Sequence, residues 1–179
     1  MIAAAFMIAA SASNPVRLYG CKMDECWWYK EQSTTSLLRN RDGELLKYVT
    51  LEGSSGHPDD NFPERYSPAL HVRFEKKITY VFYSRTRPSI AFYTENGPGG
   101  KEWIGHMLDF YDLYGYNSWS AVSYMRACHH QDLAGAAAEG RLRRLGYRRG
   151  TPSTQIELRK PTDLADGSIV AAAVAAASR

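Results

Sequence analysis

Apolar and polar side chains alternate along most of the N-terminal half of the chain, with the period of two that is typical of β-strands. This alternation predicts strands at 16–19, 45–51, 70–74 and 89–94, and a run of aromatic and β-branched residues predicts another at 27–38. Residues 78–83 are apolar on both alternating faces, which predicts a central strand. The Asp42-Gly43 pair favours a tight turn that joins the second and third strands in a hairpin. We expect a further turn at 75–77 and a surface loop at 53–63, where glycine, serine, proline and aspartate predominate.

The pattern changes to a helical one in the C-terminal half. Asn117 or Ser118 can cap a helix that places Trp119, Val122, Met125 and His129 on one stripe. A second predicted helix begins at Asp132 and ends at Gly146, a residue suited to the left-handed backbone that closes many helices. A short helix is also favoured over 103–111.

The last part of the chain alternates again at 155–159, which predicts a return to the sheet. It then becomes alanine-rich over 163–179, and we expect a weak helix or a disordered tail there. Strands followed by helices predict an α+β fold, a mostly antiparallel sheet from the N-terminal half packed by two or three helices from the C-terminal half. We expect one globular domain at 13–162.

The first ten residues carry no charge and lead into Ala10-Ser11-Ala12, the small-x-small pattern of a signal-peptidase site. Residues 1–12 are therefore predicted to be a signal peptide, cut after Ala12, which places the protein in the periplasm or outside the cell. The alternatives are a start further upstream or a fraying N-terminus. The apolar stretch falls short of the roughly 20 residues that span a membrane, so we expect no transmembrane segment.

Composition indicates a folded globular protein, because 44% of the 179 residues are hydrophobic and 23% are charged. The formal net charge is only +3. Proteins that bind the phosphate backbone of nucleic acids usually carry a stronger positive charge. The sequence therefore predicts no nucleic-acid partner.

Three cysteines, Cys21, Cys26 and Cys128, allow a single disulfide in three ways. Cys21 with Cys26 is favoured, because closing so short a loop is easy. The main alternative pairs either of these residues with Cys128, which would join the N-terminal strand to a later helix. If the protein is not exported, three buried thiols are expected instead.

No residue pattern predicts a catalytic centre, a cofactor site or a metal site. Cys128-His129-His130 groups three possible metal ligands, but consecutive residues of a helix point about 100° apart and rarely face one ion. We therefore expect a buried thiol followed by two histidines at a helix end. The alternative hypothesis of an enzyme is a small hydrolase acting on envelope material through His57, Asp59 and Glu64, whose loop can gather an acid and a base.

The Cys21–Cys26 ring is the segment that best combines rigidity with exposed chemistry. A closed ring would present Lys22, Asp24 and Glu25 with little entropy left to lose on binding, and Trp27 and Trp28 follow directly. Aromatic side chains dominate the energetics of many interfaces. We therefore predict a non-enzymatic binding domain that contacts a protein or an envelope component through these five residues. In the alternative interpretation the ring only holds a strand end, and both indoles lie in the core.

The segment Cys21-Lys22-Met23-Asp24-Glu25-Cys26 resembles the Cys-Lys-Pro-His-Asp-Cys loop of the Ivy-type periplasmic inhibitors of vertebrate lysozyme. Cys21, Lys22 and Cys26 match that loop, while Met23 and Asp24 stand where the family has proline and histidine. In the family a disulfide closes this loop and the loop plugs the catalytic cleft of the enzyme. The resemblance implies that the ring of this chain inhibits lysozyme.

Overall fold

A computed structural model describes residues 14–57, 61–97, 100–113, 117–131 and 138–177. The predicted signal peptide, 1–12, lies outside the described residues. The described part holds seven strands, β1(Arg17–Lys22), β2(Glu25–Asn40), β3(Gly43–Gly56), β4(Glu75–Tyr83), β5(Ser89–Gly97), β6(Gly100–Met107) and β7(Gln155–Leu158). Its helices are η1(Pro68–Leu70), α1(Ser118–His129), α2(Ala138–Arg144), η2(Pro161–Ala165) and α3(Gly167–Ala177).

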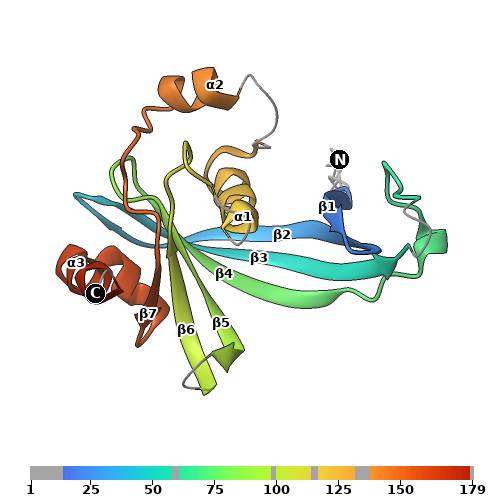
Figure 1. Ribbon diagram of the computed structural model, residues 1–179, viewed down its shortest axis with the longest axis horizontal. Coiled ribbons are helices and arrows are strands. Elements are labelled where there is room, and N and C mark those ends of the chain that lie inside the picture. Colours follow the sequence, from blue (N-terminus) through green and yellow to red (C-terminus); the bar gives the residue numbers. More distant parts are fainter. Residues whose placement is uncertain (1–13, 58–60, 98–99, 114–116, 132–137, 178–179) are drawn as a thin grey trace, which may run out of the picture.

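All seven strands form one antiparallel sheet in which each strand lies beside the next one in sequence (Figure 1). The predicted hairpin is present. The Asn40 side-chain oxygen accepts hydrogen bonds from the backbone N–H groups of Asp42 and Gly43, at 2.9 and 3.0 Å, and closes the turn between β2 and β3. The predicted α+β class, with sheet in the N-terminal part and helices in the C-terminal half, is confirmed.

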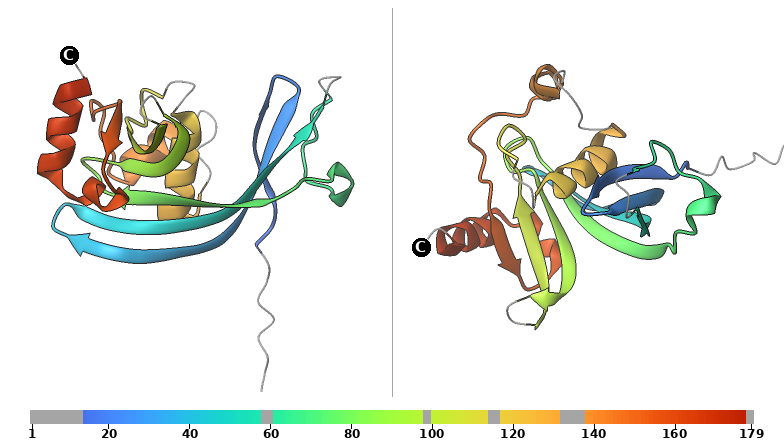
Figure 2. Two further views of the ribbon diagram at one scale, coloured as in Figure 1. Left: turned by 90° about the horizontal axis from the view of Figure 1, so that it is seen from below. Right: turned by 45° about the vertical axis from the view of Figure 1, so that its right-hand side comes forward.

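Both faces of the central strands are buried. Side chains of neighbouring residues in a strand point to opposite faces, so Val81 packs in one apolar cluster and Phe82 in another. The first cluster includes Tyr124 and Met125 of α1, and the second includes Leu164 of η2. Figure 2 shows how strongly the sheet that separates these clusters curves.

The predicted strand at 70–74 is wrong. Pro68–Leu70 form a short 3₁₀ helix capped by Ser67, and His71 then adopts left-handed backbone (φ 50°), which ends any extended run. The strand begins instead at Glu75, which pairs with Glu52 of β3. Residues 75–77 are therefore strand rather than turn.

The predicted helix at 103–111 is also wrong, because β6 occupies Gly100–Met107. This strand lies between β5 and β7 and is covered on both faces, so its residues from Ile104 to Met107 are all buried. A strand buried on both faces has no apolar–polar alternation, and its sequence does not distinguish it from a helix. The loop expected at 53–63 likewise begins later, since β3 continues to Gly56.

The C-terminal helices follow the predicted pattern in part. α1 begins at Ser118 after Asn117, and Gly146 has the left-handed backbone (φ 85°) expected just beyond α2. The predicted cap of the second helix, Asp132, lies outside the described residues. The alanine-rich tail forms η2 and α3, and Leu164 and Val170 are buried against the sheet. These two side chains thus pack with the rest of the domain.

Candidate binding cleft

Strands β4 and β5 pair over only three residues and then part. The last pair is Tyr80 with Ala91, and we call this point the fork. Before Tyr80, β4 remains paired with β3, and after Ala91, β5 remains paired with β6. The β3–β4 pair and the β5–β6 pair therefore diverge (Figures 1 and 2). Trp103 of β6 makes edge contacts with Tyr80 and with Tyr93, at 5.4 and 5.3 Å between ring centres, and fills the space beside the fork.

A cavity of about 800 Å³ occupies the gap between the diverging strands and extends to α1. We call it the β4–β5 cleft. Its apolar wall includes Ile78, Tyr80, Phe92, Tyr93, Trp103 and Trp119. Ligand sites in proteins commonly have volumes of roughly 300 to 1,000 Å³ and walls of this apolar, aromatic kind. The cleft therefore has the size and lining of a ligand site.

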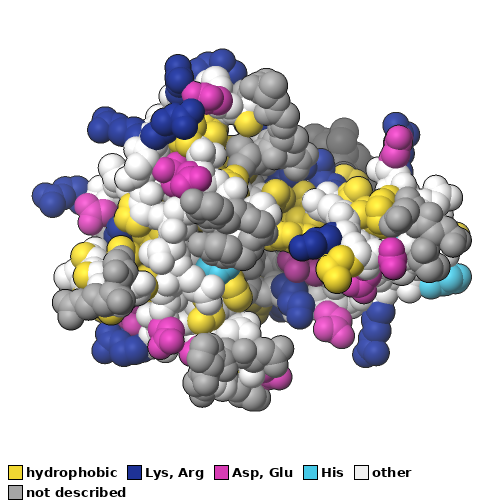
Figure 3. All heavy atoms as spheres, in the orientation of Figure 1, with side chains coloured by type: hydrophobic (Ala, Val, Ile, Leu, Met, Phe, Trp, Pro, Cys, Tyr) yellow, Lys and Arg dark blue, Asp and Glu magenta, His cyan; other side chains and the backbone are white. Residues whose placement is uncertain are grey.

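Three large apolar side chains of the cleft are open to solvent. Ile78, Tyr93 and Trp119 are 36%, 46% and 38% exposed. In the orientation of Figure 1, apolar side chains gather near the centre of the molecular surface, beside lysine, arginine and acidic side chains (Figure 3). Neighbouring exposed apolar side chains are a common property of interaction surfaces.

One polar group in the cleft is the carboxylate of Glu52. The Tyr19 hydroxyl donates to it at 3.1 Å and the Thr50 hydroxyl at 2.6 Å. Burial, with the nearby Glu52 charge as the next cause, raises the pKa of Tyr19, so its hydroxyl keeps the proton. The same hydroxyl lies 3.3 Å from Ser123 of α1, which ties the helix to the sheet at the cleft wall.

A second polar pair, His106 of β6 and Ser120 of α1, also lines the cleft. The His106 Nδ1 and the Ser120 hydroxyl are 2.7 Å apart, and both residues are buried. Burial lowers the pKa of His106, although a hydrogen bond to the Gln155 side chain opposes this shift, so the neutral ring predominates at pH 7. Phe92 packs against the same ring in a T-shaped arrangement. A neutral histidine and a hydroxyl are suited to orienting a polar group of a ligand.

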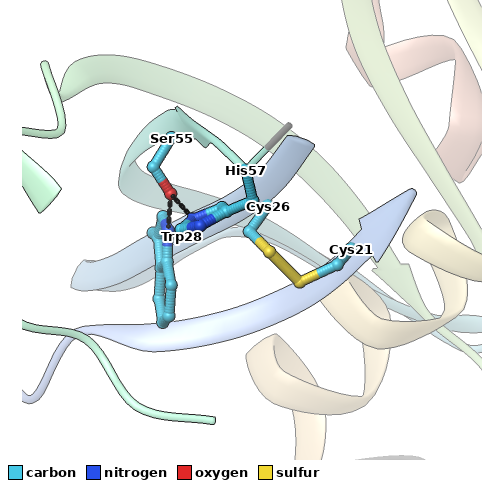
Figure 4. The surroundings of a disulfide bond; sticks show 5 residues. All are labelled: Cys21, Cys26, Trp28, Ser55 and His57. Carbon is cyan, nitrogen blue, oxygen red and sulfur yellow. Dashed lines mark hydrogen bonds between the residues drawn. A yellow bond between two sulfur atoms is a disulfide. The ribbon is translucent and has the colours of Figure 1, made fainter. Parts of the chain in front are cut away.

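The disulfide joins Cys21 and Cys26, as the favoured prediction had it, and Cys128 is a free, half-buried thiol. Burial raises the pKa of the Cys128 thiol, so it stays protonated. The bridge joins β1 to β2 next to the tip of their hairpin (Figure 4). Met23 and Asp24, at the tip, adopt left-handed backbone.

The predicted contact residues of the ring lie in different environments. Lys22 and Asp24 are exposed at the hairpin tip, and Glu25 accepts a hydrogen bond from Ser54 at 2.9 Å. Trp27 is half-buried. Trp28 is fully buried, and its indole N–H donates to Ser55 at 2.8 Å (Figure 4). The Trp28 indole thus belongs to the core and presents no surface to a partner.

The cleft and the hairpin meet through an aromatic cluster. Trp27 contacts Trp119 edge to face at 5.3 Å, and Trp119 also packs on Tyr19, which stacks on Tyr29. Trp27 is therefore the one predicted contact residue that the structure brings to the cleft wall.

Of the residues in the hydrolase hypothesis, the structure describes His57 and Glu64, and no hydrogen bond or ion pair joins these two. The His57 ring lies 2.9 Å from the Ser55 hydroxyl, and the backbone N–H of His57 donates to the Asp24 carbonyl. Glu64 is exposed, and Asp59 lies outside the described residues. Among the described residues no cluster of three or more histidine, cysteine, aspartate and glutamate side chains is arranged to hold a metal ion. No helix in the described ranges is long and apolar enough to cross a membrane.

Sequence reasoning missed the cleft. Its wall residues come from β1, β3, β4, β5, β6 and α1, and no local pattern connects them. The one signal in the sequence was Ile78. It is the first residue of a segment that is apolar on both faces, yet it lies outside the part of β4 that pairs with β5, so its side chain can line a cleft.

Comparison of the chain with protein-family models, with curated proteins and with solved structures finds no match.

Proposed function

We propose that this protein is a non-enzymatic binding domain whose binding site is the β4–β5 cleft. The observation that carries the proposal is the exposure of Ile78, Tyr93 and Trp119 in one cavity of about 800 Å³. Burying these side chains against an apolar or aromatic ligand would contribute favourable free energy in proportion to the area covered. The neutral His106 and Ser120 would orient a polar group of that ligand.

The proposal includes export to the periplasm or the outside of the cell. Disulfides persist in oxidising compartments and are rare in the cytosol, so the Cys21–Cys26 bridge supports this location. The hairpin tip belongs to the same binding surface, because Trp27 links it to Trp119 at the cleft wall. A macromolecular partner that enters the cleft would thus also reach Lys22 and Asp24.

Binding of the fluorescent dye 1-anilinonaphthalene-8-sulfonate tests the site. The dye is aromatic and anionic, and it suits an apolar cleft whose wall also carries Lys76 and Lys77. We expect saturable binding that weakens about tenfold in Trp119→Ala, since truncation removes a large contact surface. Tyr93→Ala should weaken it in the same direction.

The matched control is Leu37→Ala, which removes an exposed apolar side chain outside the cleft. It should bind the dye like the unaltered protein. Absence of saturable binding, or equal affinity in Trp119→Ala and Leu37→Ala, would contradict the proposed site.

A further inference from the structure

Beyond the fork, some backbone N–H and C=O groups of β5 point toward the cleft. In a strand the N–H and C=O groups of successive residues point alternately to the two neighbours. The Leu108 N–H donates to the Pro88 carbonyl at 2.9 Å, so even-numbered residues of this segment bond to β6. The odd-numbered ones, Ala91 and then Tyr93, point to the other side.

The same alternation sets the open edge of β4. Ala91 pairs with Tyr80, so the even-numbered residues of β4 face the cleft and the odd-numbered ones face β3. Beyond Tyr80 the even-numbered residues are Ile78 and Lys76, and the described residues provide no strand partner for them on this side. Their two N–H groups and two C=O groups form a short strand edge along the cleft.

We propose that the cleft receives an extended peptide segment of another protein, which adds to β4 as a strand through the backbones of Lys76 and Ile78. This inference rests on the proposed binding function and names its ligand class. An extended peptide is the ligand whose own donors and acceptors alternate at the spacing of this edge. A compact apolar molecule would leave the four backbone groups without partners.

The cleft wall also selects side chains of the peptide. Side chains of an added strand would alternate between the two faces of the sheet. Apolar ones would cover Ile78, Tyr93 and Trp119, the exposed side chains of the wall. Lys76 and Lys77 lie on the same wall and favour an acidic residue in the segment. The Glu52 carboxylate already accepts two hydrogen bonds, so it repels an acidic residue of the peptide less than a free carboxylate would.

The test begins with a displayed library of random linear peptides selected on the purified protein. Selected peptides should alternate apolar residues and include an acidic one. Lys76→Pro removes the N–H that faces the cleft and leaves the β3 ladder intact, because proline is tolerated on a strand edge whose N–H points away from the sheet. Lys76→Ala is the matched control, since it removes the same charge and keeps the N–H.

We expect Lys76→Pro to bind a selected peptide about tenfold more weakly than Lys76→Ala does, the effect of one lost backbone hydrogen bond. Both variants should bind 1-anilinonaphthalene-8-sulfonate with equal affinity, which establishes that the cleft is intact. Methylation of a peptide backbone nitrogen should abolish binding only at every second position, where the N–H faces β4.

Equal peptide affinity of the two variants would overturn strand addition. Failure to select any cleft-binding peptide would overturn it too, and if the dye still binds in the cleft, the proposed binding function stands with a small molecule as its ligand. Failure of both dye and peptide to bind would overturn the proposed function and this inference together.

Discussion

At the scale of single residues, the buried indole of Trp28 depends on one acceptor. Its N–H donates to the Ser55 hydroxyl, which also contacts His57 (Figure 4). We predict that Ser55→Ala lowers the free energy of unfolding by about 1 to 3 kcal/mol, because it leaves a buried donor without a partner. Ser54→Ala, next in the chain and only part-buried, should cost less. Urea unfolding measures both, and equal losses would contradict the assigned role of Ser55.

His129 makes stability depend on pH. Burial and the neighbouring charges of Arg85 and His130 lower its pKa from the ordinary 6.5 to about 4. As the pH falls through this interval the unfolded chain takes up the proton first, so the free energy of unfolding decreases between about pH 6.5 and pH 4. We expect a loss on the order of 1 kcal/mol, because the ring is only half-buried and solvent screens it.

His129→Gln should flatten this part of the stability profile, measured by urea unfolding at several pH values. The matched control is His71→Asn, which removes an exposed histidine that has no part in the His129 shift and suits its left-handed backbone. The lowered pKa of His106 adds a dependence of the same sign, which remains in both variants. An unchanged slope in His129→Gln would exclude His129 as its source.

At the scale of elements, local sequence predicted those parts of the fold that local chemistry determines. Asn40 to Gly43 make their own turn, and the Cys21–Cys26 ring needs little loop closure, so both were predictable. β6 was not, because its burial on both faces depends on β5, β7 and the helices around it. The 70–74 segment carries a strand-like alternation, but the left-handed His71 and the neighbouring 3₁₀ helix override it.

The hairpin ring provides an element-scale prediction. Removing a disulfide that closes so short a loop should cost about 2 kcal/mol, mainly by freeing the unfolded chain. We expect this loss in Cys21→Ala/Cys26→Ala, with far-UV circular dichroism unchanged. Cys128→Ala removes a thiol without a bridge and serves as the control. Stability equal to that of the control would mean that the ring contributes nothing to the fold.

The resemblance of the ring to lysozyme inhibitors stays a prediction. The tip does protrude, with Met23 82% exposed. Slowing of lysozyme-driven lysis by the purified protein would support it, and no inhibition at micromolar excess would remove it.

At the scale of the whole molecule, the candidate site is a consequence of how the sheet divides. Tyr19 and Trp119 stand far apart in sequence yet pack together at the cleft wall. The two-faced apolar pattern of 78–83 predicted a central strand, and β4 is central between β3 and β5. The pattern held no information about the fork, because the side chains that pack there, such as Trp103 of β6 and Trp119 of α1, come from other segments of the chain.

The central claim is that ligands bind in the β4–β5 cleft, and an NMR titration tests it most directly. The ¹⁵N-labelled protein is titrated with 1-anilinonaphthalene-8-sulfonate, and the amide shift changes are mapped on the structure. We predict that the largest changes fall on Lys76–Thr79, Phe92, Tyr93, Trp103 and Trp119. Changes confined to the hairpin tip at 22–25, or scattered without saturation, would contradict the claim.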